Sequence, residues 1–156
     1  MKQIDMLLGK YGESHMNATN KLIHWVCVPL IMFSLFTMLY SIPFFSERTF
    51  FTNWAMVILV LALIYYARLS MIMFTGFLMI GTVMIWAINT MYAWSDFNAG
   101  KLALWGVIIF VTAWIGQFIG HKIEGKKPSF FQDLQFLLIG PAWLLSFIFK
   151  KVGIQY

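Results

Sequence analysis

The chain has few charged residues and a single cysteine among its 156 residues. Charged side chains make up 11% of it, whereas soluble globular domains carry roughly 25%, so an ordinary soluble domain is excluded. Cys27 has no second cysteine to pair with, which excludes an intramolecular disulfide and leaves the redox compartment open. No short apolar segment with a small-residue cleavage site precedes the first long apolar run, so we expect no removable signal peptide.

Apolar and aromatic residues are abundant instead, at 61% and 19% of the chain. This composition is typical of an all-α polytopic membrane protein, and the length suits a single integral membrane domain over residues 1–156. The net charge of +5 comes from basic residues scattered at the ends of apolar segments. We therefore expect contacts with anionic membrane lipid and no nucleic-acid partner.

Four apolar runs are long enough to cross the hydrocarbon core of a membrane, which takes about 20 residues. They cover residues 22–40, 50–67, 69–94 and 102–119. Little more than Arg68 separates the second run from the third, and an arginine facing lipid at mid-membrane is costly, so we predict a tight helical hairpin there.

Two further segments have weaker signals. A fifth run, 130–149, contains Gly140 and Pro141 and either spans the membrane or is re-entrant. Near the start of the chain, apolar residues at positions 4, 7, 8 and 11 follow helical spacing and predict a short amphipathic helix on the membrane surface.

Lysine and arginine indicate the orientation, because they gather in cytoplasmic loops. With a cytoplasmic N-terminus, Arg48 and Lys101 lie outside and nine basic residues lie inside if the fifth run is re-entrant. If the fifth run spans, the counts are four outside and seven inside. Both counts favour a cytoplasmic N-terminus, and we expect the bacterial inner membrane, or the endoplasmic reticulum in a eukaryote.

The chain has only three histidines, His15, His24 and His121, and this topology places all of them at the cytoplasmic face. A single interfacial histidine is usually an amphipathic surface residue, whereas three on one side of the membrane support a metal site and a surface role equally. Three imidazoles with the Glu124 carboxylate suit Fe(II), Zn(II), Mn(II) or Cu(II), and the spacing does not decide between these metals. Candidate supporting residues are Glu13, Asn20 and Gln117.

Other polar and small residues in the apolar runs have structural interpretations. Asn89 lies toward the outer end of its run, away from the histidines, and predicts a hydrogen bond between helices. Gly116 and Gly120 form a small-xxx-small pair, which predicts close packing of two helices.

Two blocks of the sequence resemble the signatures of a known family. Residues 11–24, from Tyr11 to His24, followed by Val28-Pro29, resemble a His-x4-Asn-x2-Ile-His…Val-Pro signature. Residues 114–128 resemble its partner, Gln-x2-Gly-His-x2-Glu-x3-Pro. The family comprises small membrane proteins similar to the fungal Fe(II)-dependent 2-hydroxy fatty acid dioxygenase, which acts in α-oxidation during phytosphingosine breakdown. The C-terminal part looks closer to bacterial members, and most bacteria lack phytosphingosine.

The resemblance implies that His15, His24 and His121 bind Fe(II), with O2 as co-substrate and a 2-hydroxy fatty acid as substrate. It also implies site roles, not assigned further, for Asn20 and Gln117 as well as Glu124. Cleavage between C1 and C2 would give a fatty acid one carbon shorter. Basic residues available to steer the substrate carboxylate are Arg68, Lys122, Lys126 and Lys127.

Two other classes of function stay open at this point. One is a membrane hydroxylase or desaturase, although three histidines are too few for the di-iron sites of those enzymes. The other is a transporter or lipid-binding scaffold that uses the histidines as a ligand or proton site. No repeat relates the two halves of the chain, as it does in many transporters.

Overall fold

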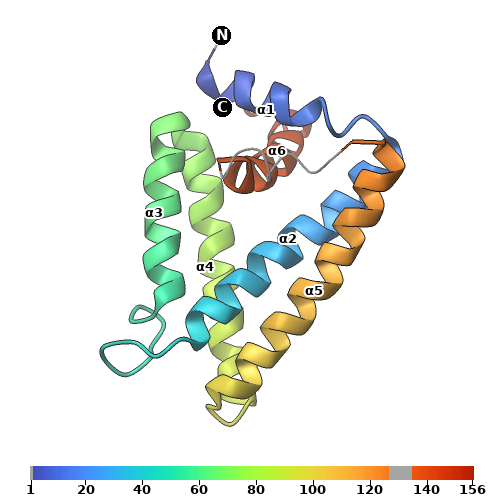
Figure 1. Ribbon diagram of the computed structural model, residues 1–156. Helices are drawn as coiled ribbons and strands as arrows, with labels where there is room; N and C mark the ends of the chain where they lie inside the picture. Colours follow the sequence, from blue (N-terminus) through green and yellow to red (C-terminus); the bar gives the residue numbers. More distant parts are fainter. Residues whose placement is uncertain (1, 127–134) are drawn as a thin grey trace.

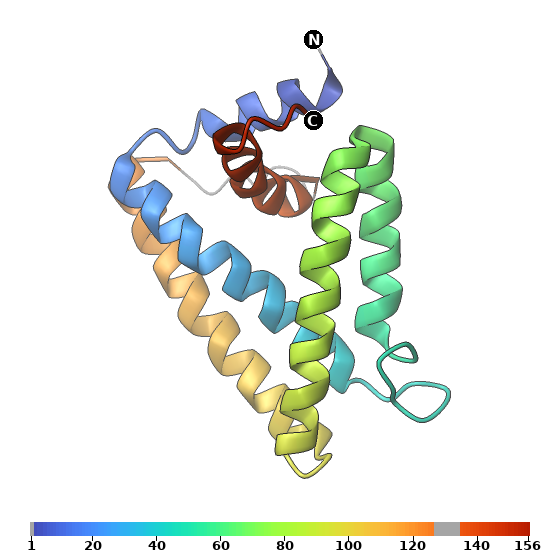
Figure 2. The ribbon, with the colours of Figure 1, turned by 180° about the vertical axis from the view of Figure 1, so that it is seen from behind.

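The structure, a computed structural model, describes residues 2–126 and 135–156, which are all-helical without strands (Figure 1). These residues form helices α1 (Gln3–Gly12), α2 (Ala18–Ser41), α3 (Trp54–Leu69), α4 (Met71–Trp94), α5 (Ala99–Glu124) and α6 (Gln135–Lys151). Two antiparallel pairs, α2 with α5 and α3 with α4, meet at one end of the bundle and diverge toward the other (Figures 1 and 2). Helices α1 and α6 lie across the end where the pairs diverge (Figures 1 and 2).

Three of the helices, α2, α4 and α5, are long and apolar enough to cross a membrane. This is the composition of an integral membrane protein. The expected fourth span is not confirmed, because α3 has only 16 residues and is about 24 Å long, against a hydrocarbon core of about 30 Å. It starts at Trp54 rather than at position 50, because the Asn53 side chain caps it by accepting a hydrogen bond from the Met56 N–H at 2.8 Å.

The predicted hairpin between α3 and α4 is confirmed and turns on a single residue. The N–H of Ser70 donates to the Tyr66 carbonyl at 2.8 Å and closes α3. The hydroxyl of the same serine accepts from the Met73 N–H at 3.3 Å and caps α4. Arg68 therefore lies in the last turn of α3, where it is exposed.

Helices α2 and α5 pack closely, as the glycine pair predicts. A Cβ atom added at Gly116 would lie 2.6 Å from the Cys27 sulfur, and one at Gly120 would meet the Asn20 side chain. The predicted hydrogen bond of Asn89 is also confirmed, since it accepts from the Tyr40 hydroxyl at 2.8 Å and links α4 to α2. The glycines bring the two helices that carry histidines within contact distance.

Helix α1 packs on α6, and Ile4, Leu8 and Tyr11 form its buried face. The position of α1 at a membrane surface stays a prediction. Helix α6 continues through Pro141 and lies beneath α1, with both of its ends at that end of the bundle (Figures 1 and 2). The first part of the expected fifth run lies outside the described residues.

Candidate metal centre

Three histidines from three segments converge at the end of the bundle covered by α1. His15 lies in the loop between α1 and α2, His24 in the second turn of α2, and His121 in the last turn of α5. Their side chains are 1%, 1% and 5% exposed, and one ring nitrogen from each lies within 4.8 Å of the others. The antiparallel helices α2 and α5 therefore bring His24 and His121 together at one end of the bundle.

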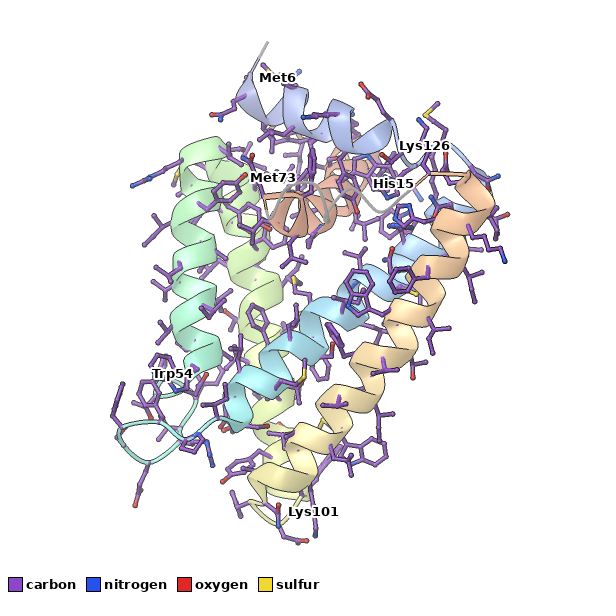
Figure 3. The ribbon with its side chains drawn as sticks, in the orientation of Figure 1. Met6, His15, Trp54, Met73, Lys101 and Lys126 are labelled. Atoms are coloured by element: carbon purple, nitrogen blue, oxygen red, sulfur yellow. The ribbon has the colours of Figure 1, made fainter. Side chains whose placement is uncertain are left out.

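The cluster occupies one end of the bundle. His15 lies beside the end of α5, near Lys126, whereas Trp54 and Lys101 lie at the opposite end (Figure 3). Lys101 and the histidines thus lie at opposite ends of the bundle, and their placement on opposite sides of a membrane stays a prediction.

Backbone carbonyls set the protonation of two of the rings. The Nδ1 atom of His15 lies 2.7 Å from the Tyr11 carbonyl oxygen, and that of His24 lies 2.9 Å from the Asn20 carbonyl oxygen. A carbonyl oxygen can only accept, so both Nδ1 atoms carry the hydrogen and both Nε2 atoms of the neutral rings have bare lone pairs.

These two Nε2 atoms face each other at 2.9 Å. Two bare lone pairs at this distance repel, and a cation beside both of them removes the repulsion. The Nδ1 atom of His121 is buried and has no hydrogen-bond partner among the described residues, which by itself costs about 1–3 kcal/mol. The three histidines therefore fit a transition-metal ion. His15 and His24 have the second ring nitrogen bonded to a carbonyl, as metal ligands commonly do, and His121 adds a third buried ring beside them.

The surroundings of His15 keep its ring neutral. The Tyr11 ring stacks on it with centroids 4.2 Å apart and an interplanar angle of 11°, and Trp143 covers it at 5.2 Å. Burial lowers the pKa of His15 to about 4 and outweighs the opposing effect of its bond to the Tyr11 carbonyl. At neutral pH the ring is therefore unprotonated and able to bind a metal.

Glu124 has a different set of partners from a metal ligand. Its carboxylate accepts the N–H groups of Met16 at 2.8 Å and Asn17 at 2.9 Å, the residues that follow His15. It also accepts from the side-chain amide of Asn20 at 3.0 Å. Within the described residues, the group of potential ligands comprises the three histidines without Glu124. These three hydrogen bonds hold the histidine segments together, and the role of Glu124 as a metal ligand stays a prediction.

The remaining predicted site residues lie at the rim or away from it. The Lys126 ammonium donates to the backbone carbonyl of Glu13 at 2.6 Å, a second link between α5 and the loop that carries His15. Lys122 and Arg68 are exposed, and Lys127 lies outside the described residues. The steering roles of these basic residues stay predictions.

An apolar cavity of about 360 Å³ reaches the cluster from inside the bundle. Its volume is in the range of small-molecule pockets, about 300–1,000 Å³. Gln117 and His121 of α5 line it together with apolar residues of α2, α3, α4 and α6. A second and more polar pocket, of about 410 Å³, reaches His15 from the surface between α1 and α6 and is lined by Lys21 and Lys150.

Comparison with known proteins identifies the family of the chain. Residues 1–152 match the family described as 2-hydroxy-palmitic acid dioxygenase Mpo1-like. The chain belongs to this Mpo1-like family. It is 31% identical over 146 residues to the 2-hydroxy-palmitic acid dioxygenase MPO1 of Saccharomyces cerevisiae, covering 92% of this chain and 78% of the yeast protein. No solved structure matches the chain.

Two residues of the Mpo1-like centre were missed by the sequence argument. Tyr11 lies four residues before His15, as Asn20 does before His24, and this shared spacing is a signal for the carbonyl contacts. No local sequence pattern predicts the contact of Trp143 with His15, because the tertiary fold brings α6 to His15.

Proposed function

We propose that this Mpo1-like chain is an Fe(II)-dependent dioxygenase that cleaves the C1–C2 bond of 2-hydroxy fatty acids. The observation that carries the proposal is the pair of bare Nε2 atoms of His15 and His24, facing each other beside His121 at the end of an apolar cavity. Family membership and the printed activity of the yeast relative, a 2-hydroxy-palmitic acid dioxygenase, support the same reaction.

The overall reaction balances without an external reductant. The C1–C2 bond breaks, C2 becomes the carboxyl carbon of the shorter acid, and C1 leaves as carbon dioxide with one molecule of water. The two carbons lose four electrons, which is the number that one O2 accepts. Iron, when bound by the three histidines, supplies the redox chemistry that brings O2 and the 2-hydroxy acid to reaction.

The residues of the chain hold the metal and exclude water. His15 and His24 keep their Nδ1 hydrogens on the carbonyls of Tyr11 and Asn20, which fixes both ring orientations. Glu124 acts on the site as a positioning residue. It holds the backbone N–H groups of Met16 and Asn17, which follow His15, and the side-chain amide of Asn20.

The apolar cavity takes the acyl tail of the substrate in this proposal. Helix α2 lines it from Val28 to Leu39, and α3 and α4 form the facing wall. The site lies at the cytoplasmic face of the membrane, where Lys122, Lys126, Lys127 and Arg68 attract the carboxylate before it enters.

The direct test is oxygen consumption by protein purified and loaded with Fe(II) without air, on addition of 2-hydroxypalmitate. We expect iron to be retained and O2 uptake to yield an acid one carbon shorter, identified by mass spectrometry. Palmitate gives the matched substrate control, and His121→Ala the matched protein control, both without uptake. Stoichiometric iron without turnover would refute the reaction, and the absence of bound iron would favour a lipid-binding scaffold.

A further inference from the structure

Gln117 is a buried hydrogen-bond donor without a partner. The residue is 4% exposed, and its Nε2 atom makes no hydrogen bond within the part of the chain that the structure describes. An unpaired buried donor costs about 1–3 kcal/mol, so a helix that keeps one needs a reason. Gln117 lies one turn from His121 on α5, and both line the same cavity.

Apolar residues form most of the rest of this cavity, beside the polar atoms of Tyr11, Trp114 and His121. The residues that line it include no lysine, arginine, aspartate or glutamate. The Tyr66 hydroxyl, which also lines it, already donates to the Leu138 carbonyl at 2.7 Å. A carboxylate that enters such a cavity needs a donor, because an unpaired charge in apolar surroundings is very costly.

We propose that the Gln117 carboxamide anchors the carboxylate of the acyl ligand, its Nε2–H donating to a carboxylate oxygen. The inference rests on the proposed function and deepens it by naming the residue that recognises the acid group. Gln117 lies at the histidine end of the cavity, so the acid group lies there and the tail follows α2 toward Leu39. Helix α2 extends about 22 Å from His24 to Leu39, so an extended tail can follow it.

The test measures binding to metal-free protein in detergent, by displacement of a fluorescent fatty acid. Three probes are compared: 2-hydroxypalmitate, palmitate and hexadecane-1,2-diol, which has no carboxylate. A hydrogen bond to a charged group corresponds to about a tenfold or larger change in affinity. Gln117→Leu should therefore weaken both acids about tenfold or more and leave the diol nearly unchanged.

A second variant and a stability measurement separate binding from folding. Gln117→Glu, of nearly the same shape, should weaken both acids further because its carboxylate repels theirs. The ligand-free Gln117→Leu protein should unfold at the same temperature as wild type or higher, because an unpaired donor has been removed. Leu30→Met, on the exposed side of α2 and outside the cavity lining, is the matched control and should leave all three affinities unchanged.

Several results would overturn the assignment. Unchanged affinity for both acids in Gln117→Leu, a loss confined to the hydroxylated probes, or an equal loss for the diol would each exclude the carboxylate contact. Failure of the proposed function is distinguishable from this outcome. If only the function fails, both acids still bind through Gln117 in metal-free protein, but the iron-loaded protein consumes no O2.

Discussion

The side-chain amide of Asn20 donates a hydrogen bond of 3.0 Å to the Glu124 carboxylate, joining the first turn of α2 to the last turn of α5. The Asn20 backbone carbonyl meanwhile accepts from the His24 ring, so one residue links the carboxylate to a histidine. Through Met16 and Asn17, the same carboxylate also holds the loop of His15. A single acidic side chain thus connects all three segments of the candidate metal centre.

Replacing Glu124 by Gln should weaken metal binding while leaving the helices formed. The NH2 group of a glutamine side chain cannot accept from the N–H groups of Met16 and Asn17. The glutamine can therefore replace at most part of the three hydrogen bonds that Glu124 accepts. Loss of such supporting bonds typically lowers metal affinity about 10- to 100-fold. Competition with a chelator of known affinity measures the change. Asp96→Asn is the control, since Asp96 pairs with Lys101 on the exposed surface at the other end of the bundle. Equal losses in both variants would contradict a positioning role.

Removing the metal should lower the unfolding temperature of the protein. A ligand that binds only the folded state at 100 times its Kd stabilises that state by about 2.7 kcal/mol. Thermal unfolding in detergent, with and without a chelator, measures the difference. His24→Ala should abolish it while remaining helical by circular dichroism. A chelator effect of the same size in His24→Ala would show that the ion binds elsewhere.

The metal-free protein should lose stability as the pH falls below about 6.5. The unfolded chain binds a proton on His15 near pH 6.5, whereas burial lowers the pKa of the folded state to about 4. The unfolded state is therefore favoured progressively between these values, by up to about 1.4 kcal/mol per pH unit from this residue. Chemical unfolding at pH 7, 6 and 5 measures the slope, which should be smaller in His15→Asn. Parallel slopes in the two proteins would contradict this origin.

Gly120→Ala should disturb the histidine cluster through the contact between α5 and α2. The added methyl group would meet the Asn20 side chain, which must then move away from Glu124. Overpacking of this kind costs about 1–3 kcal/mol, measured as a lower unfolding temperature. Gly9→Ala is the control, because no atom of the residues that the structure describes lies within 4 Å of its new methyl group. There we expect a gain of about 0.5–1 kcal/mol from helix propensity.

Leu39→Trp should shift the preference of the enzyme toward shorter acids. Leu39 lines the cavity at the end of α2 away from the histidines, so a larger side chain shortens the space for the tail. The ratio of kcat/KM for 2-hydroxydodecanoate to that for 2-hydroxypalmitate should rise at least severalfold. Leu30→Trp, on the exposed side of α2, should leave the ratio unchanged. A similar shift in both variants would exclude the tail position.

The sequence predicts the histidine cluster well where the order and direction of the helices place a residue. It predicts the cluster poorly where contacts between distant parts of the chain place it. Antiparallel runs were sufficient to bring His24 and His121 together. Helices α2 and α3 start at other residues than the apolar runs predict. Their starts are set by the side-chain caps Asn17 and Asn53, which hydropathy does not mark. The partners of Glu124 could not be predicted, since they come from backbone groups more than 100 residues earlier in the chain.

The distribution of the histidines along the chain has a consequence for biogenesis. His15 and His24 are synthesised with the first membrane segment, whereas His121 arrives only with the last turn of α5. A nascent chain therefore has only two of the three candidate ligands until α5 has been inserted and has docked on α2. Loading of the proposed metal would then be a late step of membrane assembly, and an ion bound at that stage would hold the two helices together.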